Sequence, residues 1–238
     1  MYRILMLAIL LAALPASTAL AGPPLPEFEA EYRAYYGSMR GADTRFSLER
    51  GEDGDWLWRS FSEPAGMVSM FRNDEIRERS RFRFEDDGLV PLSYHYRHEE
   101  GGDLRRKREV HFDWDTGRAR FDDDGDTGEL EVAAGTLERF LAQLALMHDL
   151  SRDQRRDEYR VVHRDEIIDQ SVEYAGEERK RVRAGNFDTF RVHLRDTDSD
   201  RKLTLWLAPE LDYLPVQLLR SEPDERDIRM ELESWDGL

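Results

Sequence analysis

Most of the chain alternates apolar and polar residues with a period of two. Ala30 and Tyr32, for example, alternate with Glu29 and Glu31, and the pattern returns in most later segments. Such alternation is typical of antiparallel strands that bury one face and expose the other to water. Turns rich in glycine and aspartate recur at intervals of about 8 to 12 residues, the spacing of a sandwich, a barrel or a large curved sheet. The pattern therefore predicts a mainly β protein.

One stretch, at about residues 136–150, has helical spacing instead. Its apolar residues recur three or four positions apart and form one stripe along a helix. Thr136 is the expected N-cap, because its hydroxyl can accept a hydrogen bond from the first turn. We therefore predict a single large curved antiparallel sheet, or an open half-barrel, with one central helix packed on its concave face. The stripe consists of Leu137, Phe140, Leu141, Leu144 and Met147.

Residues 1–21 have the features of a secretory signal peptide. Arg3 precedes an apolar run that ends at Leu14, and Ala19-Leu20-Ala21 forms an Ala-x-Ala cleavage site. We expect cleavage after Ala21, a periplasmic location, and one β-rich domain over residues 22–238. The apolar run is too short for a membrane span, and no later segment approaches the required length. The sequence contains no cysteine, so we expect no disulfides and no lipid anchor on a cysteine.

The net charge of the chain is −16 at pH 7. A strongly acidic protein is repelled by phosphate backbones and by anionic lipid surfaces. The charge therefore argues against a nucleic-acid partner and against membrane binding by charge alone.

Residues able to perform catalysis or bind metal do not form a recognisable motif. His95 and His98 are three residues apart on a predicted strand, so they point to opposite faces. Ser38 lies one position away from its place in a Gly-x-Ser-x-Gly motif. The acidic run that begins at Asp122 has Thr127 where a calcium loop requires glycine. We predict no catalytic residues, no metal and no cofactor, and the sequence leans against an enzyme.

Some charged residues occupy positions on the inward face, where apolar residues are expected. If Leu104 and Val110 face inward, Arg106 and Arg108 do so as well, and a buried charge needs a partner. One interpretation is a bulge, or a water-filled barrel end, that returns the arginines to solvent, with the aromatic residues filling a core. The other is a ligand pocket with a few polar groups. The candidate ligand-binding residues are Trp56, Trp58, Glu78, Phe82, Phe84, Tyr94, Tyr96, His98, Arg106, Arg108, Trp114, Leu141, Leu144 and Met147.

Several short motifs, in a fixed order, resemble the exported bacterial family known as domain of unknown function 3108. They are Leu25-Pro-Glu-Phe-Glu-Ala30, Gly37 and Gly41, Pro64-Ala-Gly66, Glu78-Arg-Ser80-Arg-Phe82, Pro91-Leu-Ser-Tyr94, Val110-His-Phe-Asp-Trp114, Gly185-Asn-Phe187, Leu205-Trp-Leu-Ala-Pro209 and Tyr213-Leu-Pro215. The resemblance implies a periplasmic all-β protein without an assigned activity, so it supplies no catalytic residues. A looser architectural likeness is to the periplasmic lipoprotein carriers, whose half-barrel encloses a hydrophobic cavity closed by helices.

Two classes of function remain open on these grounds. The first is a periplasmic binding or carrier protein for an apolar or amphipathic, lipid-like ligand in cell-envelope biogenesis, with the helix as a lid. The second is a structural or interaction module with a filled core, with the helix as a plug, that docks on another envelope protein. A hydrolase is a less favoured third possibility.

Overall fold

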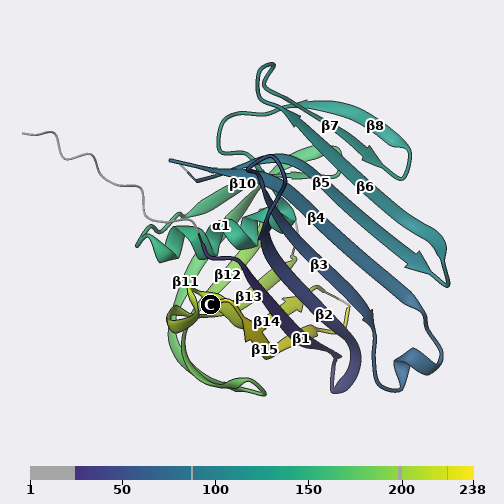
Figure 1. Ribbon diagram of the computed structural model, residues 1–238, viewed down its shortest axis with the longest axis vertical. Helices are drawn as coiled ribbons and strands as arrows, with labels where there is room; N and C mark the ends of the chain where they lie inside the picture. Colours follow the sequence, from purple (N-terminus) through teal and green to yellow (C-terminus); the bar gives the residue numbers. More distant parts are fainter. Residues whose placement is uncertain (1–24, 87, 198–199, 224) are drawn as a thin grey trace, which may run out of the picture.

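The computed structural model describes residues 25–86, 88–197, 200–223 and 225–238, and the predicted signal peptide lies outside these ranges. Within them the chain is mostly strand, with one α-helix and two short 3-10 turns (Figure 1). The elements are Phe28–Tyr36 (β1), Met39–Arg50 (β2), Trp56–Pro64 (β3), Val68–Met70 (η1), Asp74–Glu85 (β4), Gly88–Glu100 (β5), Asp103–Asp113 (β6), Arg118–Asp123 (β7), Asp126–Glu131 (β8), Leu137–Glu138 (β9), Arg139–Ser151 (α1), Glu158–His163 (β10), Glu166–Val182 (β11), Gly185–Asp196 (β12), Lys202–Ala208 (β13), Pro209–Leu211 (η2), Leu214–Ser221 (β14) and Ile228–Asp236 (β15).

All strands belong to one 15-stranded sheet. Its order is β8-β7-β6-β5-β4-β3-β2-β1-β15-β14-β13-β12-β11-β10-β9. The pairings are antiparallel except that of β9 with β10. Consecutive strands pair with each other except β8 and β9, and the pairing of β1 with β15 joins the two meanders. Strands β8 and β9 end the order, so the sheet is open, and the prediction of a single large curved sheet or open half-barrel is confirmed.

The helix α1 lies inside the curve of the sheet and between its two wings (Figure 1). It is buried on all sides, and even Leu146, on the side opposite the predicted stripe, is inaccessible to solvent. The ring of Phe140 stacks on Trp58 with centroids 5.3 Å apart, and Trp58 stacks on Phe46 at the same distance. A helix that is buried on all sides is part of a core. The prediction of one helix on the concave face is confirmed.

The predicted start of this helix is wrong by three residues. Leu137 and Glu138 are extended and pair with β10, so α1 begins at Arg139 and its N-cap is Glu138. Thr136, the expected N-cap, is buried and its hydroxyl has no hydrogen-bond partner. Pairing with a distant strand therefore overrides the local capping preference.

The predicted inward orientation of Leu104 is also wrong. A bulge between His98 and Glu99 shifts the pairing of β5 with β6 by one residue. Leu104 therefore pairs with Glu99 on the outer face, and it is 45% exposed. The bulge lies before Arg106, so it leaves Arg106 and Arg108 in the same register as Val110.

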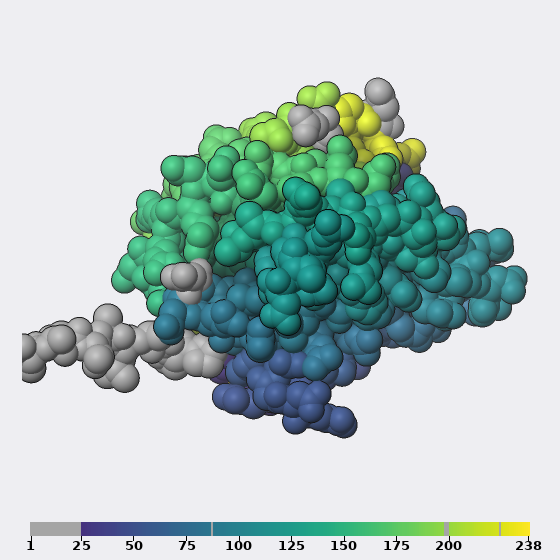
Figure 2. All heavy atoms as spheres, turned by 90° about the horizontal axis from the view of Figure 1, so that it is seen from above, coloured from purple at the N-terminus to yellow at the C-terminus, as the bar shows by residue number. Residues whose placement is uncertain are grey.

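The two ends of the sheet come close together without pairing. A surface hollow of about 430 Å³ is lined by Gly117 and Val132 beside the β7–β8 hairpin and by Arg160 and Ile167 from β10 and β11. In the space-filling view, the teal and green parts of the chain meet on this side of the molecule (Figure 2). The fold is therefore a curved sheet that nearly surrounds its helix.

Candidate functional site

The concave face changes from apolar to polar along the strands. Trp58, Ser80, Tyr94 and Val110 are direct neighbours across β3, β4, β5 and β6, next to the N-terminal end of α1. The next inward level of the same strands contains almost only polar residues. We call this level, with its continuation onto β7, the polar row, and the part of the concave face around it the open end. The polar row consists of Ser60, Glu78, Tyr96, Arg108 and Asp123.

The apolar half of the predicted pocket is filled by the helix. The side chains of α1 that were expected to line a pocket are fully buried against the sheet. Phe84 makes an edge contact with Trp56 at 5.2 Å, and the indole of Trp114 donates to the Pro91 carbonyl oxygen at 2.7 Å. These residues therefore pack as a core in this structure. The buried members of the predicted set are Trp56, Trp58, Phe82, Tyr94, Leu141, Leu144 and Met147.

Glu138 lies between the core and the open end, and no sequence motif predicted its position. Its carboxylate accepts hydrogen bonds from the backbone N–H groups of Phe140 at 2.7 Å and Leu141 at 2.8 Å. The Ser80 hydroxyl of β4 donates to the same carboxyl group. Burial nevertheless raises the pKa of Glu138 to about 8, because it outweighs the three donors. This carboxyl is closed off from solvent, so it serves the helix as a cap.

Glu78, one level further along β4, is only partly buried. The Tyr94 hydroxyl donates to Glu78 Oε1 at 2.6 Å. Burial raises the pKa of Glu78, while the Tyr94 hydrogen bond and the charge of Arg108 act against the rise. The sequence placed Glu78 on the inward face, and the strand pairing shows the same placement.

The two inward arginines share a carboxylate of β7. Arg108 Nη2 lies 3.0 Å from Asp123 Oδ2, and Arg106 Nη2 lies 3.8 Å from Asp123 Oδ1. Arg108 and Asp123 keep only 16% and 15% of their side-chain surface exposed. The Nε atoms of both arginines are buried without a hydrogen-bond acceptor. The bulge therefore does not return the two arginines to the outer face, but Arg106 keeps 42% of its side-chain surface exposed, so water reaches this end of the fold, as the other form of that alternative predicts. Asp123 is the partner that the burial of Arg108 requires.

The opposite wall of the open end comes from the second meander. Arg139, the first residue of α1, donates to Asp196 Oδ2 at 2.7 Å, and the Gln170 amide donates to Asp196 Oδ1 at 3.0 Å. Burial, with the nearby charges of Arg139 and Arg108, lowers the pKa of His163 to about 4. His163 is therefore neutral at ordinary pH, and its Nδ1 is buried without a partner.

His98 completes the set of predicted residues at the open end. It lies next to Arg106 across β5 and β6, and its Nε2 is 2.9 Å from Asp74 Oδ1. Among the described residues, no group of three or more histidine, aspartate or glutamate side chains is arranged to hold a metal ion. The open end thus brings together Glu78, Tyr96, His98, Arg106 and Arg108 from the predicted set, whereas the remaining members pack in or against the core. Their role in ligand binding stays a prediction.

A family model settles the relationship of this chain to other proteins. The model, described as a protein of unknown function (DUF3108), matches residues 31–233. The chain belongs to the DUF3108 family. The family resemblance stated from the sequence motifs is therefore confirmed.

The fold of this DUF3108 chain is shared with a solved structure. The crystal structure of a beta-barrel-like protein of domain of unknown function DUF1849 from Brucella abortus is similar, with a TM-score of 0.60 and 10% identity. The alignment covers 90% of this chain and 98% of that chain. At this identity the likeness concerns the fold alone. No curated protein matches the sequence.

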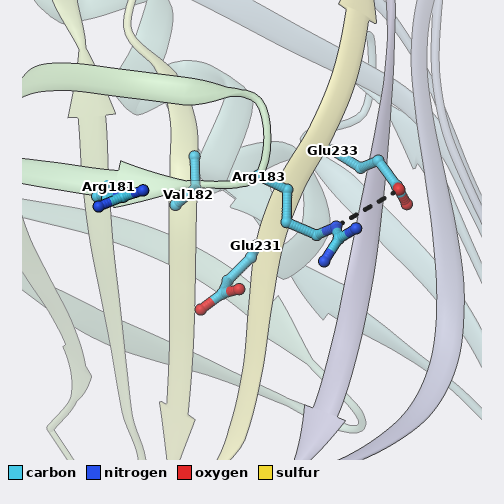
Figure 3. A pocket seen from close by; sticks show the side chains of 5 residues that line it. All are labelled: Arg181, Val182, Arg183, Glu231 and Glu233. Atoms are coloured by element: carbon cyan, nitrogen blue, oxygen red, sulfur yellow. Dashed lines mark ion pairs between the residues drawn. The ribbon is translucent and has the colours of Figure 1, made fainter.

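A second hollow lies on the outside of this DUF3108 chain. Its volume is about 540 Å³, and it is lined by Arg181, Val182 and Arg183 at the end of the β11–β12 hairpin and by Glu231 and Glu233 of β15 (Figure 3). Ala184 donates its backbone N–H to the Leu232 carbonyl oxygen at 3.1 Å, which fastens the hairpin over β15. Arg183 Nε lies 3.7 Å from Glu233 Oε1, and this ion pair spans the hollow. The hollow follows from this hairpin contact, and its lining is too polar for an apolar ligand.

Several residues of the open end were missed by the sequence analysis, although parity along the strands could have found them. Asp196 continues the inward positions Val192 and Leu194 of β12, and Arg220 continues Leu218 of β14. The same period of two that placed Arg108 inward applies to both. What the sequence could not show is that the pairing of β1 with β15 joins these strands to the same curved sheet as β5 and β6.

Proposed function

We propose that this chain is a periplasmic binding or carrier protein for an amphipathic, lipid-like ligand in cell-envelope biogenesis. The observation that carries the proposal is the composition of the open end. There the polar row lies beside aliphatic side chains on the same concave face that remain half-buried, namely Ile76, Leu203 and Met230. A surface with apolar area and a few fixed polar groups suits a ligand that has both an apolar and a polar part.

The periplasmic location in this proposal rests on the sequence. The leader that ends at Ala21 predicts export to the periplasm. A curved sheet whose concave face is open at one end, in that compartment, suits a protein that shields part of an amphipathic ligand from water. Among the described residues, no helix is both long enough and apolar enough to cross a bilayer.

Native mass spectrometry of protein isolated from the periplasm tests the proposal. We expect additional mass from a bound acyl ligand, and uptake of a fluorescent fatty-acid probe after that ligand is removed. Ile76→Glu should weaken the binding of the probe, because it places a charge among the aliphatic side chains of the open end. Leu104→Glu is the matched control, since Leu104 is already exposed. Wild-type protein that carries no ligand and ignores the probe would contradict the proposal.

A second candidate is an interaction module that docks on another envelope protein. Two observations favour it: the helix fills the apolar half of the concave face, and one loop exposes three large apolar side chains. Met67, Met70 and Phe71, in and around η1, are 70%, 75% and 83% exposed. Clustered exposed apolar residues commonly mark a protein contact. A photocrosslinking residue in place of Phe71 should then capture one envelope protein, whereas the same residue in place of Arg179, exposed on β11, should not.

The buried Ser80–Glu138 pair gives no support to a hydrolase. Both side chains are essentially inaccessible to solvent, and the carboxyl group is occupied by the first turn of α1. A nucleophile and its base must reach a substrate. We therefore do not propose hydrolysis.

A further inference from the structure

The open end contains arginine side chains in an otherwise strongly acidic protein. Arg106 and Arg108 occupy inward positions where strand alternation would place apolar residues. Their well-buried partner is the single carboxylate of Asp123, while the carboxylate of Asp124, 3.5 Å from Arg106 Nε, is 47% exposed. The Nε atoms of both arginines are buried without a hydrogen-bond acceptor, so the concave face holds guanidinium donors that the two carboxylates do not satisfy.

A third arginine approaches from the other meander. Arg220 of β14 lies in the same register as Leu218 and next to Leu203, on the concave face. Its partners are Glu222 at 2.7 Å and the exposed Glu225 at 3.7 Å, and almost half of its side-chain surface remains exposed. Strand β14 belongs to the second meander, so Arg220 presents its guanidinium group on the other wing of the concave face from Arg106 and Arg108.

The charges of all three arginines act on Tyr96. It is the direct cross-strand neighbour of Arg108 and of Glu78. Burial and the Glu78 charge raise the pKa of Tyr96, whereas Arg106, Arg108 and Arg220 all act in the opposite direction. The charge of Arg220 on β14 thus acts on the same phenol as the charges of Arg106 and Arg108 on β6, although about a hundred residues separate the two strands.

The carboxyl group of Glu78 has a donor of its own. The Tyr94 hydroxyl donates to Glu78 Oε1 at 2.6 Å, and burial raises the pKa of this carboxyl group. Arg139, the remaining arginine of the open end, is held by Asp196. The open end thus contains the Tyr96 hydroxyl and several guanidinium groups as hydrogen-bond donors.

We propose that the open end binds the anionic group of its ligand, a carboxylate or a phosphate, through Arg106 and Arg108 of β6, Arg220 of β14 and the hydroxyl of Tyr96. The proposal rests on the function proposed above and specifies the polar part of the amphipathic ligand. Guanidinium groups suit both anions, because their N–H donors match two oxygens at once. The neighbouring Ile76, Leu203 and Met230 would contact the adjoining apolar part.

Binding of four probes with the same twelve-carbon chain tests this site: dodecanoate, dodecyl phosphate, dodecanol and dodecyltrimethylammonium. Calorimetry of the full mature chain should give affinities for the two anions at least about tenfold higher than for dodecanol, the effect of one or more charge-assisted hydrogen bonds. The cationic probe should bind more weakly than dodecanol. Raising the salt concentration should reduce the preference for the anions.

Three variants show whether the named arginines produce the preference. Arg220→Gln and Arg108→Gln should each reduce the anion preference about tenfold while the affinity for dodecanol stays within about twofold. Arg105→Gln is the control on the same strand, because Arg105 points away from the inward register and is exposed. Arg108→Gln leaves Asp123 without its closest partner, so its folding is checked by circular dichroism. Arg220 is more exposed, and its variant carries the test if Arg108→Gln does not fold.

The outcomes separate this inference from the proposed function. Equal binding of dodecanoate and dodecanol by the wild type would overturn the anion site and leave a lipid-binding protein. Failure of all four probes would overturn both. An anion preference that survives Arg220→Gln would also contradict the site. Inorganic phosphate that binds as tightly as dodecyl phosphate would support the anion site, assign it to a free anion, and contradict the lipid-like ligand.

Discussion

The Ser80 hydroxyl of β4 donates a hydrogen bond to the Glu138 carboxyl group, which caps the first turn of α1. The contact links the middle of the first meander to the start of the helix. Glu138 also belongs to β9, which pairs with β10 of the second meander. One residue therefore fixes the helix to both wings of the sheet, next to the level at which the concave face becomes polar.

We expect a distinctive pH dependence from this carboxyl group. Its folded-state pKa of about 8 exceeds the ordinary value of 4.5, so between these values the folded protein holds a proton that the unfolded chain has released. The free energy of unfolding should therefore be highest below about pH 4.5 for this group, and should fall as the pH rises to about 8, by up to about 1.4 kcal/mol per pH unit.

Urea denaturation at a series of pH values measures this slope. Glu138→Gln, which cannot ionise, should flatten it between pH 5 and pH 8, whereas Glu210→Gln, at an exposed position, should not. A wild-type slope that is unchanged in Glu138→Gln would mean that another group is responsible.

His163 should act in the opposite direction. Burial lowers its pKa from 6.5 to about 4, with further lowering by Arg139 and Arg108. Between these values the unfolded chain binds a proton that the folded protein does not, so the contribution to stability is present above about pH 6.5 and is lost as the pH falls to about 4. NMR titration of the imidazole should find no protonation down to about pH 5, and a midpoint near 6.5 would contradict the placement of His163 beside these arginines.

The period of two explains how much of the open end could be predicted. Because side chains on a strand alternate strictly, Glu78, Tyr96 and Arg108 could be assigned to one face from the sequence, and the strand pairing agrees. The assignment of Leu104 failed because the bulge after His98 changes the parity, and no local residue marks that bulge.

Long-range packing explains what the sequence could not supply. Whether Trp58 lines a pocket or a core depends on the distance to Phe140, which is set by how closely the helix approaches the sheet. Glu138, rather than Thr136, is the N-cap because β9 pairs with β10. Arg220 lies on the same concave face as β6 because β1 pairs with β15. None of these pairings has a local signal in the residues concerned.

The helix should contribute strongly to stability. Leu144 is fully buried between α1 and the sheet, so Leu144→Ala removes apolar contacts and leaves a cavity. We expect a loss of about 2–5 kcal/mol in the free energy of unfolding. Phe71→Ala is the control at a large apolar residue that is exposed, and it should change stability by less than about 0.5 kcal/mol. Urea denaturation measures both, and equal small effects would show that the helix is a loosely attached lid.

Tyr94 should stabilise the fold through Glu78. Tyr94→Phe keeps the ring in the core but removes the hydroxyl that donates to Glu78 Oε1 at 2.6 Å. The partly buried carboxylate then loses a donor, so we expect the pKa of Glu78 to rise further and the free energy of unfolding to fall by about 1–3 kcal/mol. In the Glu78→Gln background, the same substitution should lower the free energy of unfolding by less, because a neutral amide depends less on that donor.

The double-mutant cycle, measured by urea denaturation at pH 7, gives the coupling free energy between the Tyr94 and Glu78 side chains, and additive effects would contradict a direct hydrogen bond. A non-zero coupling that disappears below the pKa of Glu78 would show that the bond stabilises the ionised carboxylate, the form that faces Arg108 across the polar row.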